Sequence, residues 1–349
     1  MGQDGRIELC ALNLEELKVL MNDLGEPRFR ADQVAAWVKK GTEIEDMTNL
    51  SKSLREKLSA AAVTNSVHIV EILTSKLDGT EKYLFRLSDG NIIEGVHMRY
   101  HYGDTLCIST QVGCRMGCKF CASTLEGCVR NLRAGEMIGQ VLAVNSHIQK
   151  QDTTAHGIHN IVMMGSGEPL DNYDESMRFL RLLNAENGLH ISLRNVSLST
   201  CGLVDKMLKL ADEGLPITLS VSLHAPNDEI RKQLMPVANA YKIEDILNAC
   251  SNYIEKTGRR VVFEYALVDG VNCSDSCADQ LADRLRGMQC HVNVIPLNEV
   301  KERNLSGPGP AGVERFIRHL EKRHISVTKR REMGDDIQGA CGQLRRSRL

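Results

Sequence analysis

The sequence is poor in aromatic side chains and in net charge. Aromatic residues make up 4% of the 349 residues, and only one is tryptophan, so a binding surface built from many stacked rings is not expected. Lysine and arginine total 43 against 45 for aspartate and glutamate, which leaves a net charge of −2. Proteins that coat nucleic acid without regard to sequence are basic overall. Any contact with RNA or DNA must therefore come from a local patch.

Long apolar runs are also missing. No stretch approaches the roughly 20 apolar residues that a membrane-spanning helix needs. The first six residues hold no apolar core of the kind that marks a signal peptide. Twelve cysteines in a chain of this length are too few for a disulfide scaffold. These absences predict a cytoplasmic protein that does not bind a membrane.

The pattern of residues along the chain predicts four parts. Residues 1–65 have helical periodicity that begins with a capping-box pattern at Asn13. Residues 66–104 hold three short strand patterns separated by Asp-Gly pairs, which predicts a small antiparallel β-meander. Residues 105–300 alternate apolar runs with amphipathic helix patterns, and residues 301–349 predict a C-terminal helix followed by a mobile basic tail.

The third part carries the signature of an α/β fold. Alternation of apolar strands with helices predicts parallel β/α units, and six units favour a partial (β/α)6 barrel, with a doubly wound sheet as the alternative. In either fold, ligands gather at the carboxyl ends of the strands. The expected strands are 105–110, 158–164, 195–200, 217–223, 261–268 and 292–296.

Three cysteines stand close together directly after the first expected strand. Cys114, Cys118 and Cys121 have the spacing C-x3-C-x2-C. Thiolates are soft ligands that suit zinc or an iron–sulfur cluster. A structural zinc ion needs four ligands, and Cys107 or Cys128 would be the fourth. A four-iron cluster on three cysteines leaves one iron open to a substrate, so the spacing favours the cluster, with zinc as the alternative.

This spacing resembles that of the radical S-adenosylmethionine (SAM) superfamily, in which the open iron binds SAM. The resemblance implies a [4Fe-4S] cluster on the three cysteines, and SAM as the second cofactor. It also implies that Gly167 and Glu168, which follow the second expected strand, hold the SAM amino group. Residues at the later strand ends would complete the SAM site, and these are Ser199, Ser222, Leu223, His224 and Asn298.

Three further segments resemble the RlmN/Cfr group of RNA methyltransferases, and the match spans nearly the whole chain. The segments are residues 29–33, 106–114 and 339–344. The resemblance implies methylation of C2 of an adenosine in 23S rRNA, at the peptidyl transferase centre, and of the adenosine 3′ to the anticodon in tRNA. The alternatives are a Cfr-type enzyme that acts on C8 of the same rRNA adenosine, and a zinc-stabilised RNA-binding protein without catalysis.

The same resemblance implies roles for three residues outside the SAM motifs. Cys341 would take a methyl group from one SAM, and a second SAM would activate that group for attack on adenine. Glu94 would accept the ring proton, although a single glutamate on a strand by itself predicts an exposed side chain. Cys107 would then resolve the protein–RNA adduct through a transient disulfide with Cys341.

The expected partners follow from this activity. They are 23S rRNA, tRNA and an external electron donor such as flavodoxin or ferredoxin, and the protein is expected to be a monomer. Residues 318–349 hold nine lysine and arginine residues against four aspartate and glutamate residues. We expect this tail and the helical domain of residues 1–65 to contact the RNA backbone. A solvated helix with a frayed end is the alternative for the tail.

Overall fold

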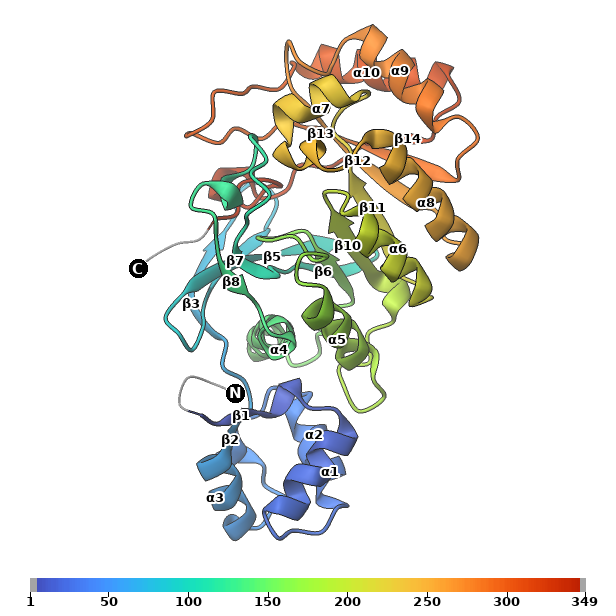
Figure 1. The fold of residues 1–349 in the computed structure, drawn as a ribbon. Helices are drawn as coiled ribbons and strands as arrows, with labels where there is room; N and C mark the ends of the chain where they lie inside the picture. The colour runs from blue at the N-terminus through green and yellow to red at the C-terminus, as the bar shows by residue number, and fades with distance from the viewer. Residues whose placement is uncertain (1–4, 346–349) are drawn as a thin grey trace.

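The computed structural model describes residues 5–345. The first four residues, and the two arginines at 346 and 348 that contribute to the basic tail, lie outside the described part. The described chain forms a helical N-terminal domain below a large sheet whose outer face is covered by helices (Figure 1). Within this part, no helix is long and apolar enough to cross a membrane.

The N-terminal domain is built from three short helices. The side chain of Asn13 accepts the backbone N–H of Glu16 at 2.9 Å, and the Glu16 carboxylate accepts the N–H of Asn13 at 2.8 Å. This reciprocal pair is the capping box that the sequence predicts. Strand β1 (Ile7–Glu8) pairs with β2 (Ala62–Val63) and closes the domain. The helices are α1 (Leu14–Asp23), α2 (Arg30–Val38) and α3 (Lys52–Ala61).

The meander extends the barrel sheet instead of forming a separate layer. Strands β3 (His68–Thr74), β4 (Glu81–Arg86) and β5 (Ile92–Tyr100) pair antiparallel, as the two Asp-Gly turns predict. Strand β5 then pairs antiparallel with β6 (Gly103–Cys107), which is the first strand of the barrel. The meander and the barrel therefore share one ten-stranded sheet in the described residues.

The six expected barrel strands are all present and lie side by side in chain order. This consecutive order has no reversal point, so it confirms the partial barrel over the doubly wound alternative. A short seventh parallel strand was not predicted, because its three residues are half-buried or exposed and form no apolar run. The strands after β6 are β9 (Asn160–Met163), β10 (Val196–Thr200), β11 (Thr218–Ser222), β12 (Val261–Leu267), β13 (Cys290–Pro296) and β14 (Val327–Lys329).

Amphipathic helices connect these strands and pack against the outer face of the sheet (Figure 1). Their apolar faces join the cores of the barrel and of the N-terminal domain into one buried cluster. The helices are α4 (Ala134–Gln151), α5 (Tyr173–Asn184), α6 (Val204–Asp212), α7 (Asp228–Leu234), α8 (Ile243–Thr257), α9 (Asp275–Leu285) and α10 (Pro310–Lys322). The carboxyl ends of the strands remain uncovered by these helices and carry the loops described next.

Candidate active site

A cavity opens among the loops at the carboxyl ends of the barrel strands. It encloses about 950 Å³ of space, its open mouth included. Of the residues predicted for the site, Glu94, Cys107 and Leu223 do not line it. The predicted residues that do line it are Cys114, Cys118, Cys121, Gly167, Glu168, Ser199, Ser222, His224, Asn298 and Cys341.

A small hairpin closes the base of the loop that carries the three clustered cysteines. Strand β7 (Gln111–Gly113) pairs antiparallel with β8 (Cys128–Asn131). Gly113 has a φ of +78°, and a Cβ on it would lie 2.0 Å from the carbonyl oxygen of Gly127. Only glycine fits at this crossing. The hairpin thus brings the start and end of the loop together and directs its cysteines into the cavity wall.

The three thiols fit an iron–sulfur cluster better than a zinc ion. Burial, with a contribution from the neighbouring thiolates, raises the pKa of Cys114 to about 12 and that of Cys118 well above its usual value. A cationic metal group would offset this cost. Within residues 5–345, no three His, Cys, Asp or Glu side chains group closely enough to hold a single metal ion. Zinc needs four ligands around one point, whereas the cysteines of a cluster bind different irons.

The loop after β9 is packed tightly against the segment that leads into β7. Gly167 has a φ of +114°, and a Cβ there would lie 2.7 Å from the backbone nitrogen of Gln111. The Glu168 N–H donates to the Gln111 side chain at 2.9 Å. The buried Glu168 carboxylate accepts the N–H groups of Leu170 at 3.0 Å and Cys201 at 2.7 Å. It therefore joins two neighbouring loops of the cavity wall and keeps lone pairs free to accept from an ammonium group.

His224 supplies a neutral hydrogen-bond donor to the cavity wall. Its Nδ1 accepts the N–H of Ala266 at 2.9 Å, which places the ring proton on Nε2. Burial, together with the charge of Arg231, lowers the pKa of His224 to about 3. The residue has a φ of +54°, a left-handed conformation that is costly for histidine. Such strain at a strand end in a cavity is typical of a functional position.

The C-terminal tail crosses the cavity between the β13 end and the cysteine loop. Cys341 lies exposed on this tail. Several hydrogen bonds hold the tail, and three of them use its backbone carbonyls as acceptors. The donors are Asn298 Nδ2 to Cys341 (3.0 Å), Ala122 N to Gly342 (2.7 Å) and Ser123 Oγ to Leu344 (2.6 Å). The structure thus holds a docked tail, and its mobility stays a prediction.

Cys107 lies behind this tail, at the end of β6. It is buried in a small apolar cluster with Met98, Met333 and Leu344. Burial and, to a smaller extent, the charge of Cys341 raise the pKa of Cys107 to about 12, against the opposing charge of Arg330. The fold therefore brings the two predicted partner cysteines within range of each other's charge. Both are free thiols here, and the disulfide between them stays a prediction.

Glu94 is buried, contrary to what a single glutamate on a strand suggests. Only 3% of the residue is exposed, because the docked tail covers this face of β5. The carboxylate lies 3.4 Å from Lys82 Nζ and accepts the backbone N–H of Arg345 at 2.9 Å. Burial raises the pKa of Glu94, and the charge of Lys82 opposes this rise.

The chain matches two family models and close relatives along almost its full length. The models describe the radical SAM superfamily, over residues 108–278, and a ribosomal RNA large subunit methyltransferase N-terminal domain, over residues 7–64. The chain is 54% identical to the probable dual-specificity RNA methyltransferase RlmN of Alkaliphilus oremlandii, covering 99% of both chains. It is 53% identical to that of Lachnoclostridium phytofermentans, covering 98% of this chain and 95% of the relative. The chain belongs to the RlmN family of radical SAM RNA methyltransferases.

A solved structure agrees with this assignment. The crystal structure of a radical SAM methyltransferase from Sphaerobacter thermophilus superposes with a TM-score of 0.93 at 42% identity, covering 97% of this chain and 99% of that one. Membership in the RlmN family confirms the predicted enzyme class and its two cofactors, the [4Fe-4S] cluster and SAM. It does not favour the Cfr-type or the non-catalytic zinc-binding alternatives.

Two arginines of the RlmN-family site were missed from the sequence. Arg330, just after β14, lines the cavity with Nη1 3.3 Å from the Glu264 carboxylate and 3.5 Å from Met164 Sδ. Arg231 on α7 is fully buried and donates to the carbonyls of Cys201 and Leu223. The second bond holds the Leu223 carbonyl, while the Leu223 side chain lies in the core. Nothing in the sequence distinguishes these arginines from the many on the surface.

Proposed function

We propose that the protein methylates C2 of an adenosine in 23S rRNA and of the adenosine 3′ to the anticodon in tRNA. Relatives named as dual-specificity RNA methyltransferases support both kinds of RNA as substrates. The observation that carries the proposal is the docked tail, which puts Cys341 on the wall of the same cavity as the cysteine loop. The enzyme would work in the cytoplasm as a monomer, with electrons from a flavodoxin- or ferredoxin-type donor.

The cavity residues would hold the two cofactors. Cys114, Cys118 and Cys121 would bind three irons of the cluster, and the Gly167–Glu168 loop would accept the SAM ammonium group. The remaining wall residues, Ser199, Ser222, His224 and Asn298, together with the Leu223 backbone, would contact the rest of SAM. When bound, the cluster and SAM supply a methyl group and a 5′-deoxyadenosyl radical. A closed, largely apolar wall would keep water from that radical.

The chain's own residues would then carry the methyl group to the base. The Cys341 thiolate would attack the SAM methyl carbon and become S-methylcysteine. Loss of a hydrogen atom from this group would let its carbon add to adenine C2, a carbon too electron-poor for ordinary methylation. The adduct would lose one electron, which replaces the electron consumed in SAM cleavage, and the Glu94 carboxylate would take the C2 proton. The Cys107 thiolate would then attack the Cys341 sulfur, so that a disulfide forms and the bond from this sulfur to the methylene carbon breaks. That carbon would take a proton and stay on C2 as the methyl group, and an external reductant would return the disulfide to two thiols.

The docked tail sets an order on these steps. Arg345 donates its N–H to Glu94, so the base is already engaged while the tail is docked. Because Glu94 is only 3% exposed beneath the tail, the tail would have to move before the ring proton could reach this carboxylate. The basic tail would meanwhile contact the RNA backbone, because residues 318–349 carry a local excess of positive charge on a near-neutral chain. The helical N-terminal domain would contact the RNA as well, although residues 1–65 hold nine lysine and arginine residues against eleven aspartate and glutamate residues.

Product mapping tests this function directly. The anaerobically reconstituted enzyme, given isotope-labelled SAM, a 23S rRNA fragment and tRNA, should yield 2-methyladenosine in both RNAs by mass spectrometry. A label at C8 would contradict the proposed position, and label in rRNA alone would contradict the tRNA activity.

Two cysteine variants test the roles of the tail and of β6. Cys341→Ala should form no S-methyl group and no RNA adduct. Cys107→Ala should still become methylated and attack RNA, but should then accumulate as a covalent protein–RNA species on denaturing gels. Normal turnover by either variant would remove the assigned role.

A further inference from the structure

Two of the chain's few aromatic residues stack at the turn between β5 and β6. The rings of Tyr100 and Tyr102 are nearly parallel, with centroids 4.9 Å apart and 6° between their planes. His101 packs edge-on against Tyr102 at 5.0 Å. Tyr102 is 61% exposed, whereas Tyr100 is half-buried. Tyr100 therefore packs against the protein, and Tyr102, stacked on it, is exposed to solvent.

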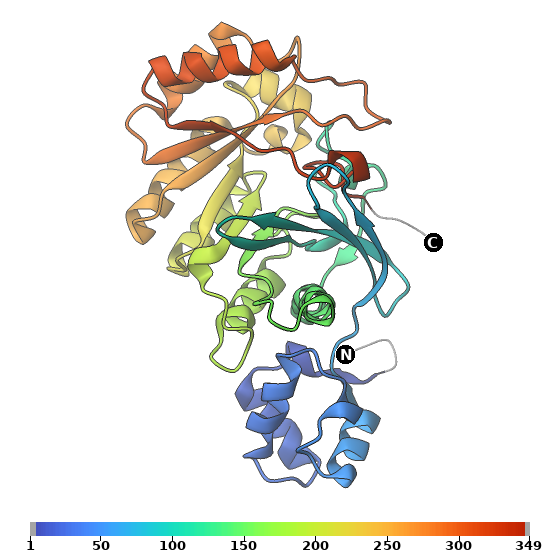
Figure 2. The same ribbon diagram turned by 180° about the vertical axis from the view of Figure 1, so that it is seen from behind.

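Tyr100 connects this pair to the active site. It packs against the apolar cluster that holds Cys107, Met333 and Leu344, and its hydroxyl donates to Met98 Sδ at 3.5 Å. This is the cluster on which the docked tail rests. Figure 2 shows the teal β5–β6 hairpin on the same side of the barrel as the red C-terminal segment.

Positive charge accompanies the two rings. Burial raises the pKa of Tyr100 and of Tyr102, and the guanidinium of Arg330 opposes both shifts, so this cation lies near both phenols. Arg330 also lines the cavity, and Arg331 beside it is exposed. An exposed aromatic ring close to arginines is an arrangement with which proteins bind single-stranded nucleic acid, through base stacking and phosphate contacts.

We propose that Tyr102, supported from behind by Tyr100, is a stacking site for a nucleobase of the substrate RNA that flanks the target adenosine. This inference rests on the proposed function, which supplies RNA as the ligand. An adenine that reaches Cys341 must leave its stack, and this leaves a neighbouring base without a partner. The free face of Tyr102 would replace that partner and so hold the opened RNA at the cavity.

Substitution of the outer ring tests the stacking site. Tyr102→Ala should raise both the Kd and the KM for RNA about tenfold, since stacking on an aromatic ring is worth about 1–3 kcal/mol per base. Tyr102→Phe, which keeps the ring, should behave as the wild type. The salt dependence of binding should not change, because no charge is removed. Cys341 S-methylation without RNA should also be unaffected, which separates stacking from damage to the site.

Leu208→Ala, at an exposed apolar position on α6, is the matched control and should not alter RNA binding. RNA binding by Tyr102→Ala equal to that of the wild type would overturn the proposal. In another outcome, the variant binds RNA normally, turns over slowly with flavodoxin as the electron donor, and turns over at the wild-type rate with dithionite. That result would overturn the stacking proposal in favour of a docking surface for the electron donor. A wild type that binds RNA without methylating it would refute the proposed function, while the binding comparison would still decide this inference.

Discussion

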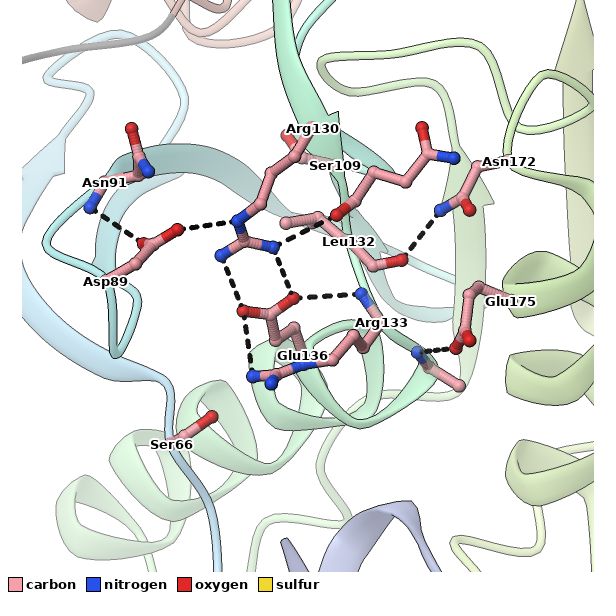
Figure 3. Close-up of polar contacts among 12 residues, drawn as sticks. Ser66, Asp89, Asn91, Ser109, Arg130, Leu132, Arg133, Glu136, Asn172 and Glu175 are labelled. Atoms are coloured by element: carbon pink, nitrogen blue, oxygen red, sulfur yellow. Dashed lines mark hydrogen bonds and ion pairs between the residues drawn. The ribbon is translucent and has the colours of Figure 1, made fainter. Parts of the chain in front are cut away.

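Two regions of the molecule differ in how their buried polar groups are paired. One is the junction, where the N-terminal domain meets the start of α4, and the other is the catalytic cavity. At the junction (Figure 3), the fully buried Glu136 carboxylate on α4 accepts two N–H groups of Arg130 at 2.8 Å and the Arg133 backbone N–H at 2.9 Å. Arg130 also binds Asp89 at 2.6 Å, and the Arg133 side chain reaches Glu8 of β1 at 2.6 Å. Three separate segments are thereby fastened to the start of α4.

The loops beside the cavity leave polar groups unused. The buried hydroxyl groups of Thr110 and Ser166 have no hydrogen-bond partner among residues 5–345. His224 holds a left-handed backbone, and the Cys341 thiol lies exposed. Unpaired or strained polar groups cost stability, and a folded protein retains them where a ligand or a reaction uses them. From this contrast we expect the junction residues to stabilise the fold and the cavity residues to take part in the reaction. Three substitutions test this expectation.

Glu94 is the strongest test, because it is buried and paired like a junction residue yet is proposed to act as a base. Glu94→Gln keeps the shape and an acceptor for the Arg345 N–H, but removes the basic carboxylate. We expect RNA methylation to fall about a thousandfold, within the range of general-base effects. S-methylation of Cys341, followed by mass spectrometry, should continue unchanged. Equal turnover by this variant and the wild type would return Glu94 to a structural role.

Glu136→Ala should lower the free energy of unfolding without changing the rate of SAM cleavage. It leaves the Arg130 guanidinium with only Asp89 as a carboxylate partner in a partly buried site. Loss of one member of such a pair costs about 3 kcal/mol in free energy of unfolding, measured by urea denaturation. SAM cleavage per folded molecule should not change. Glu15→Ala, whose carboxylate is 69% exposed, is the control and should leave the urea midpoint in place. Loss of SAM cleavage in folded Glu136→Ala would contradict the division.

Ser123→Ala should give the smallest effect. Its buried hydroxyl is one of the donors that dock the tail, and removal of one such bond costs about 1–2 kcal/mol. The tail should then dock less often, so that S-methylation of Cys341 slows by up to about tenfold while the iron content stays constant. Ser123→Thr keeps the hydroxyl and should restore the rate. An unchanged rate in Ser123→Ala would mean that the other hydrogen bonds of the tail suffice.

Local patterns predicted the elements of this fold well. The sequence contains the information for these elements, because each depends only on residues that are neighbours in the chain. This holds for the Asn13 capping box, the Asp-Gly turns and the six apolar strands. The three-cysteine site could be predicted in the same way, because one loop carries all three thiols. Strand β14 was missed because its three residues pair through the backbone and carry no apolar pattern. The arrangement of the meander was also not predictable, since the β5–β6 pairing makes it part of the barrel sheet.

The sequence by itself determined the helices, the barrel strands, the three-cysteine loop and, through resemblance, the family. Only the tertiary structure decided that Glu94 is buried beneath the tail, that Cys107 lies within range of the charge of Cys341, and that Arg330 reaches the cavity. These facts depend on contacts between segments that lie 66 to 251 residues apart in the chain. Burial and electrostatic interactions depend on distances in the folded protein. The sequence alone therefore does not distinguish an exposed arginine from one that lines the cavity.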